Sequence, residues 1–196
     1  MHNHVSGQPK LIIICGLIGT GKSTIAREVA GSKGWTIVSS DAVRKKLAKM
    51  SATHHEYVAF EKGIYSSEFT AKTYEKMNQI AERILKEGRS VVMDASFARK
   101  EYRAKTYALA KSLNAEVTCI ELVCTDEEIK RRLTLRMKQE KQISDGRWEI
   151  FSQQKASFED VDDFADEEHI VVDTSNPTKA ESVARALKMI DTRGRS

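Results

Sequence analysis

The stretch that decides the fold is Gly16–Ser23, which reads GLIGTGKS and matches the pattern G-x-x-x-x-G-K-S without a gap. An apolar run, Leu11–Cys15, comes directly before it, and a helical segment, Ser23–Ala30, follows it and is expected to stop near Gly31. A strand, a glycine-rich turn and a helix in this order are the context in which the pattern forms a loop around phosphate groups. The stretch therefore predicts an α/β fold that begins with this unit.

The residue types in the loop suit a nucleoside triphosphate. Glycines let backbone N–H groups close around phosphate oxygens, and the start of the next helix adds a positive end. We expect Lys22 to reach the β- and γ-phosphates and the Ser23 hydroxyl to ligate Mg²⁺. A dinucleotide fingerprint is excluded, because Thr24 stands where its third glycine belongs. The expected nucleotide-binding residues in this stretch are Gly16, Gly19, Thr20, Gly21, Lys22, Ser23 and Thr24.

Strand-like and helix-like segments alternate along the rest of the chain, which indicates βα units in a parallel sheet with helices on both faces. Ligands bind beyond the carboxyl ends of the strands in such a sheet. We expect one domain over residues 1–196, with an ordered core over about 10–191. The predicted strands are Leu11–Cys15, Trp35–Ser39, Ser90–Asp94, Glu116–Val123 and His169–Asp173. The predicted helices include an apolar stripe from Met77 to Leu85 with Gly88 as its cap, Ala98–Leu113, a helix after the Thr125/Glu128 capping box, and Thr178–Ile190.

The composition fits a folded protein, with 40% hydrophobic and 31% charged residues in a chain of 196. The longest apolar run, Leu11–Ile18, is too short to span a membrane, and Met1–Lys10 carries no secretory pattern, so we expect a cytoplasmic protein. Cys15, Cys119 and Cys124 are expected to be reduced, buried thiols, and the histidines have no zinc-site spacing.

Charge is uneven along the chain although the net charge is only +4. The segment Lys130–Arg147 holds seven basic residues against two acidic ones, and phosphate contacts are expected there. The segment Glu159–Glu168 is mostly acidic and is interpreted as a solvated loop or helix face.

Polar residues after the second and third predicted strands carry the first two candidate roles. Asp41 and Arg44 stand three residues apart at the start of a helix, where a carboxylate can accept a hydroxyl proton and an arginine can hold a phosphate or the acceptor. Asp94 ends an apolar strand and can support Mg²⁺. The alternatives are a helix cap for each carboxylate and a surface charge for Arg44.

Two arginines supply the third candidate role. Arg132 and Arg136 are four residues apart and suit the charge that develops on a transferring phosphoryl group, whereas a solvated basic face is the alternative. Arg147, after a segment that looks flexible, is weighed as a lid residue and is better explained as a surface charge.

These residues together resemble the P-loop kinases related to the 5′-hydroxyl polynucleotide kinase domain, a group with zeta toxins, chloramphenicol phosphotransferase and predicted kinases with an AAA-type ATP-binding domain. The resemblance runs from Lys10 to about Ile190. It implies a P-loop NTPase three-layer sandwich with a five-stranded parallel sheet and a small helical lid. It also implies ATP and Mg²⁺ as cofactors, with Asn176 in a loop near the adenine. The catalytic set that it implies is Lys22, Asp41, Arg44, Arg132 and Arg136, with Ser23 and Asp94 at the metal.

The acceptor stays open. We expect γ-phosphate transfer to a hydroxyl of a small molecule or of a polynucleotide 5′ end, while a nucleoside monophosphate kinase-like enzyme and a non-catalytic ATP-binding module are the alternatives. A GTPase is disfavoured, because the chain lacks an N-K-x-D motif. The region expected to select the acceptor, His54–Phe69, holds aromatic residues that could stack on a base or pack in the core. No membrane partner is expected, and the sequence does not give the oligomeric state.

Overall fold

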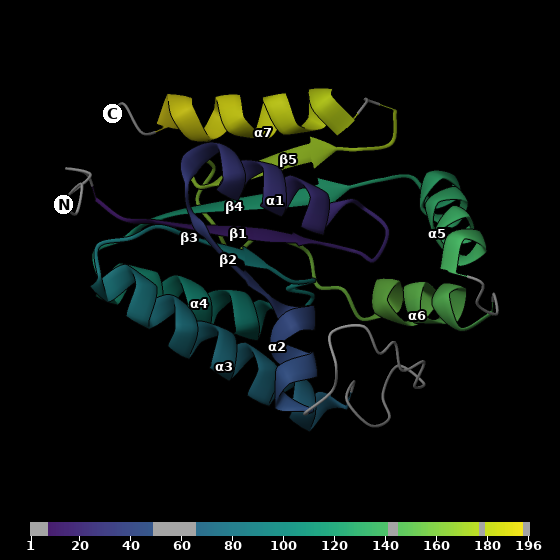
Figure 1. Ribbon diagram of the computed structural model, residues 1–196, viewed down its shortest axis with the longest axis horizontal. Coiled ribbons are helices and arrows are strands. Elements are labelled where there is room, and N and C mark those ends of the chain that lie inside the picture. Colours follow the sequence, from purple (N-terminus) through teal and green to yellow (C-terminus); the bar gives the residue numbers. More distant parts are fainter. Residues whose placement is uncertain (1–7, 49–65, 141–144, 177–178, 194–196) are drawn as a thin grey trace.

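The computed structural model describes residues 8–48, 66–140, 145–176 and 179–193 (Figure 1). Most of the region expected to select the acceptor, residues 54–65, lies outside the described residues, and so does the side chain of Arg147. Within the described part of the chain, no helix is long and apolar enough to cross a membrane.

Five parallel strands form one sheet in the order β2-β3-β1-β4-β5, which confirms the predicted fold class. In the register of the sheet, Ile14 of β1 pairs with Asp94 of β3 on one side and with Ile120 of β4 on the other. The last residue of β3 therefore lies close to the end of β1, two residues before Gly16, where the glycine-rich loop begins. The strands are β1 (Lys10–Gly16), β2 (Thr36–Ser39), β3 (Val91–Asp94), β4 (Glu116–Val123) and β5 (His169–Asp173).

Helices cover both faces of the sheet and one of its ends (Figure 1). Helices α1 and α7 lie on one face, and α3 and α4 lie on the other, with α2 beside α3. Helices α5 and α6 stand together beyond the carboxyl ends of the strands, at the place expected for a lid. The helices are α1 (Lys22–Lys33), α2 (Ser40–Leu47), α3 (Ser67–Lys86), α4 (Lys100–Ser112), α5 (Asp126–Glu140), α6 (Asp145–Ala156) and α7 (Lys179–Arg193).

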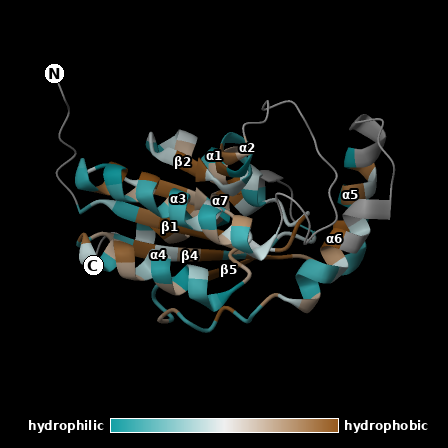
Figure 2. Ribbon diagram, turned by 90° about the horizontal axis from the view of Figure 1, so that it is seen from below, coloured by the Kyte–Doolittle hydropathy of each residue, from teal (hydrophilic) through white to brown (hydrophobic). Residues whose placement is uncertain are grey.

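Alternating side chains of the central strand enter two separate apolar layers. Leu11 and Ile13 pack in the layer with α3 and α4, whereas Ile12 and Ile14 pack in the layer with α1 and α7. This is the period-2 alternation of a strand that is covered on both faces. Figure 2 shows the same arrangement, with hydrophobic residues gathered on the strands and hydrophilic residues on the outer sides of the helices.

Helix α1 is longer than the sequence predicts, because Gly31 lies inside it and does not end it. The helix ends instead at Gly34, which has the left-handed conformation at φ 67°. Gly31 lies on an open side of the helix, where an added Cβ would meet no atom within 4 Å. A glycine interrupts a helix only weakly when the packing of its neighbours holds it, here the buried Val29 and Ala30.

The acidic segment Glu159–Glu168 is largely exposed, as its charge predicts, and one of its carboxylates is held by a buried arginine. The Arg103 guanidinium is completely buried and pairs with the Asp163 carboxylate, with Nη2 2.8 Å from Oδ1. The same guanidinium donates to the backbone oxygens of Phe97, at 2.8 Å, and Asp160, at 2.6 Å. A buried arginine with its donors satisfied thus fastens this segment to α4 and to the turn after β3.

Candidate functional site

The loop Gly16–Ser23 is held from the sheet side and from the side of α5. Gly16 has φ 134°, its N–H donates to the Ser96 oxygen at 3.1 Å, and an added Cβ would lie 2.4 Å from the backbone oxygen of Leu122. Gly19 has φ 85°, and a Cβ there would lie 3.0 Å from the Ile129 side chain. Glycine is required at both positions because the backbone is left-handed and the neighbours are in contact.

Lys22 points back over the loop. Its Nζ donates to the backbone oxygen of Leu17 at 2.8 Å, and the Thr20 hydroxyl donates to the same oxygen. Burial lowers the pKa of Lys22 from 10.5 to about 8, while the nearby Asp94 opposes that shift. The amine is therefore a positive group in a confined place, suited to bind phosphate oxygens.

Asp94 and Ser23 meet at the edge of the sheet that the sequence predicts. The Asp94 carboxyl is 5% exposed, and the Ser23 hydroxyl donates a hydrogen bond to it. Burial raises the pKa of Asp94, whereas Ser23, Lys22 and Arg27 oppose the shift. A carboxylate and a hydroxyl side by side are hard oxygen donors of the type that Mg²⁺ prefers, so the two residues fit the expected metal.

Arg132 contacts two loops rather than open solvent. Its guanidinium donates to the Gly19 oxygen and to the Thr174 hydroxyl, each at 3.3 Å, and also to the Thr174 backbone oxygen. Glu128 accepts from Arg132 Nε at 2.8 Å. Arg132 therefore joins the glycine-rich loop to the loop that follows β5.

Thr174, which the sequence analysis did not single out, completes this connection. Its side chain is 4% exposed, and its hydroxyl lies 3.0 Å from the Thr20 backbone oxygen. A buried threonine at the end of a strand has no distinguishing sequence pattern. Only its position after the predicted strand His169–Asp173 could have suggested a role.

Arg136 lies farther along α5 and has an exposed side chain. It is close enough to Lys22 to help lower the pKa of that amine. The two arginines of the predicted pair thus differ in their surroundings, although the fold brings both to the same side of the loop.

Asp41 and Arg44 diverge on α2. Asp41 is exposed and forms an ion pair with Lys45 Nζ at 2.9 Å, yet it lies near enough to Asp94 to raise the pKa of that carboxyl. Arg44 is 8% exposed, and its Nη1 lies 3.4 Å from the Thr70 hydroxyl of α3.

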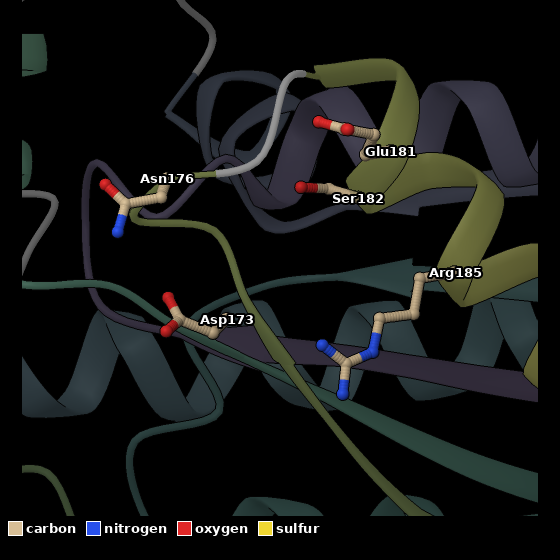
Figure 3. A pocket seen from close by; sticks show the side chains of 5 residues that line it. All are labelled: Asp173, Asn176, Glu181, Ser182 and Arg185. Atoms are coloured by element: carbon tan, nitrogen blue, oxygen red, sulfur yellow. The ribbon is translucent and has the colours of Figure 1, made fainter.

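A pocket of about 420 Å³ opens between the loop after β5 and the start of α7 (Figure 3). Asn176, the residue expected near the adenine, lines it together with Asp173, Ser182 and Arg185. Figure 3 shows Asn176 at the turn and the Asp173 and Arg185 side chains below it. Hydrogen bonds from the Ser175 side chain and from the Ser175 N–H, the latter at 2.8 Å, lower the pKa of the Asp173 carboxyl.

Curated relatives match only part of this chain. Uncharacterized proteins of Mycobacterium tuberculosis and Mycobacterium bovis are 30% identical over 116 residues, or 59% of the chain. The chain spans about a quarter of the length of these relatives, since the match covers 23% of each.

Solved structures share the fold over most of the chain. A sugar kinase from a Janibacter species is 21% identical with a TM-score of 0.65, covering 93% of this chain and 95% of that one. A gluconokinase from Sinorhizobium meliloti is 18% identical with a TM-score of 0.67, covering 96% and 95%. The APS kinase CysC of Mycobacterium tuberculosis, solved in complex with AMPPNP and APS, is 15% identical with a TM-score of 0.64, covering 94% and 99%.

The fold is therefore that of P-loop kinases. Residues 11–161 match the AAA domain family, and this stretch contains the loop Gly16–Ser23, Asp41, Asp94 and Arg132. The chain belongs to the AAA domain family.

Proposed function

We propose that this protein is an ATP- and Mg²⁺-dependent kinase that transfers the γ-phosphate to a hydroxyl of a small molecule. The observation that carries the proposal is the meeting of Lys22, Ser23 and Asp94 at the carboxyl ends of β1 and β3. One positive amine, one hydroxyl and one buried carboxyl beside a loop built on glycines form a set suited to a metal-bound triphosphate.

The nucleotide would lie along the loop, with its base toward Asn176 and its phosphates over Lys22. Ser23 and Asp94 would hold Mg²⁺, which neutralises charge on the phosphate oxygens when it is bound. Lys22 would bind the β- and γ-phosphates, and Arg136 would face the transferring group. Arg132 would keep the two nucleotide-binding loops together through Gly19 and Thr174.

Asp41 would act as the general base. Its carboxylate takes the proton of the acceptor hydroxyl while that oxygen forms a bond to the γ-phosphorus. The bond from the γ-phosphorus to the oxygen that bridges it to the β-phosphate breaks, and ADP leaves. The exposure of Asp41 and its closeness to Asp94 support this role, since an acceptor can reach it beside the metal-binding residues.

The acceptor would bind over α2 and the turn after β3. Arg44 is buried against Thr70 and lies near Tyr74 and Tyr102, whose rings stack at 4.1 Å. The structures that share the fold include a sugar kinase, a gluconokinase and an APS kinase, which supports a small acceptor. The resemblance to 5′-hydroxyl polynucleotide kinases makes an oligonucleotide the acceptor to test beside them.

The test is transfer of labelled γ-phosphate from ATP to a panel of acceptors. The panel contains gluconate and other sugar acids, neutral sugars, APS, nucleosides, and DNA and RNA oligonucleotides with 5′-hydroxyl ends. Lys22→Ala is the blank. Lys33→Ala is the matched control, because Lys33 lies at the far end of α1 and pairs with Asp191.

We expect label on a small molecule with the wild-type protein and with Lys33→Ala, and none with Lys22→Ala. Label on an oligonucleotide alone would contradict the proposed acceptor class. Equal labelling by Lys22→Ala would contradict the proposed nucleotide site. A wild-type protein that binds ATP and labels no acceptor would favour a non-catalytic ATP-binding module.

A further inference from the structure

Helices α5 and α6 pack directly on the outer side of the phosphate-binding loop. Ile129 and Leu133 of α5 and Phe151 of α6 form a buried cluster with Leu17 and Ile18 at the tip of the loop. These two loop residues are large and apolar, so the contact removes apolar surface from water. The loop therefore packs as one unit with the parts of α5 and α6 that contain Ile129, Leu133 and Phe151.

Two polar contacts fix the backbone within this unit. The Gln154 side-chain oxygen on α6 accepts a hydrogen bond from the Ile18 N–H at 2.6 Å. The Arg132 guanidinium on α5 donates to the Gly19 oxygen at 3.3 Å. The peptide unit between these two points carries the Gly19 N–H, inside the stretch whose pattern predicts phosphate binding.

We propose that Gln154 is a positioning residue for the triphosphate, acting through the Ile18 N–H on the shape of the phosphate-binding loop. The proposal rests on the proposed function, since it assumes that ATP binds this loop. A backbone N–H without a partner is costly, so the loop without Gln154 would turn to satisfy it elsewhere. With Gln154 in place, the turn over Leu17–Gly19 is set before the nucleotide arrives, which lowers the cost of binding.

Other contacts hold α6 in place independently of this hydrogen bond. Phe151 is buried in the cluster, and Lys155 pairs with Asp126 of α5 at 2.5 Å. After the helix, the Glu159 N–H donates to the Ala98 oxygen at 2.8 Å. Loss of the Gln154 oxygen is therefore expected to change the loop rather than to unfold the helix.

The experiment measures Kd for ATP and for inorganic tripolyphosphate by calorimetry, together with the thermal unfolding midpoint of the ligand-free protein. Gln154→Met keeps the length of the side chain and removes the hydrogen-bond acceptor. Gln153→Met is the matched control, because Gln153 is the neighbouring glutamine and its side chain is exposed. Gln154→Glu restores an acceptor oxygen, and it is measured at high ionic strength so that its added charge is screened.

We expect Gln154→Met to weaken both ligands about ten-fold with the unfolding midpoint unchanged, since a part-buried N–H loses its partner. Gln153→Met is expected to bind like the wild-type protein, and Gln154→Glu is expected to recover most of the affinity. Wild-type affinity in Gln154→Met would overturn the proposal and leave the proposed function intact. A lowered midpoint in Gln154→Met, without recovery in Gln154→Glu, would also overturn it by showing a structural role. A wild-type protein that binds neither ligand would instead contradict the proposed function.

Discussion

The loop Gly16–Ser23 is held at backbone groups by Ser96, Gln154, Arg132 and Thr174, which come from four other parts of the chain. The acceptor side, by contrast, presents Asp41 from a helix of eight residues, with an exposed carboxylate. The proposed nucleotide side and the proposed acceptor side of the site therefore differ in how firmly the fold holds them. Contacts from distant segments fix the proposed nucleotide side, so we expect substitutions at Asp41 on the proposed acceptor side to leave the loop in place.

The largest effect that this comparison predicts is on transfer in Asp41→Asn. The amide cannot take the proton of the acceptor hydroxyl, so we expect transfer to fall about 10²- to 10⁴-fold. ATP affinity should stay within about two-fold, because Asp41 contacts none of the groups that hold the loop. Transfer rates and calorimetry together check this. Asp191→Asn is the control, since Asp191 pairs with Lys33 far from the site. An unchanged transfer rate would remove Asp41 from the role of base.

The turn after β3 contacts the glycine-rich loop through Ser96 and lies on the proposed acceptor side, and Arg103 donates a hydrogen bond to its Phe97 backbone oxygen. Arg103→Met would leave the Asp163 carboxylate and the Phe97 and Asp160 oxygens without their partner. We expect the free energy of unfolding to fall by about 3–5 kcal/mol, measured by urea denaturation.

Arg99→Met is the control for this prediction. The Arg99 side chain is 59% exposed and lies 3.5 Å from Glu159, so its loss should cost less than about 1 kcal/mol. Equal losses in the two variants would show that the buried network does not stabilise the turn.

The connection between the glycine-rich loop and the loop after β5 predicts a smaller effect on ATP affinity. Arg132→Met removes the donor to Gly19 and Thr174, and we expect Kd for ATP to rise about ten-fold. Arg131→Met is a close control, because Arg131 also pairs with Glu128 but is exposed. The experiment is calorimetry on both variants. If both weakened ATP equally, general positive charge rather than the connection would be responsible.

The smallest effect is a pH dependence carried by Lys22. Because burial lowers its pKa to about 8, the folded protein loses the ammonium charge as pH rises through that value. We therefore expect ATP affinity to be steady below pH 8 and to fall above it. The free energy of unfolding should rise with pH between about 8 and 10.5, because the unfolded chain then binds more protons at Lys22 than the folded one.

Calorimetry and urea denaturation at pH 7, 8 and 9 on the wild-type protein and on Lys22→Met check both signs. The variant should bind ATP too weakly to titrate at any of these pH values, and the pH dependence of its stability should be lost. An ATP affinity that stays constant to pH 9 would show that another group supplies the charge.

The sequence predicts the sheet better than the contacts of the site. Strands β4 and β5 match the predicted segments Glu116–Val123 and His169–Asp173 at both ends, because short apolar runs between turn residues have few other interpretations. The meeting of Asp94 with Lys22 also follows from the sequence, since parallel strands bring their carboxyl ends to one edge.

Contacts between side chains of distant segments could not be predicted from local sequence patterns. Gln154 is 136 residues from Ile18, and Asp163 is 60 residues from Arg103, and neither pair carries a local pattern. The sequence shows the charge of the acidic segment, which is largely exposed as predicted, but not the buried Arg103 that pairs with its Asp163. The functional roles of all the site residues stay predictions, from Lys22, Ser23 and Asp94 at the glycine-rich loop to Asp41, Arg44, Arg132, Arg136 and Asn176.

The measurement that tests the central claim most directly is calorimetric titration of ATP with and without Mg²⁺ into the wild-type protein, Lys22→Ala and Lys33→Ala. We predict one ATP per chain, tighter with Mg²⁺, bound by the wild-type protein and Lys33→Ala and lost in Lys22→Ala. A wild-type protein that binds no ATP, or a Lys22→Ala variant that binds it equally well, would contradict the claim that this loop is a preformed nucleotide site.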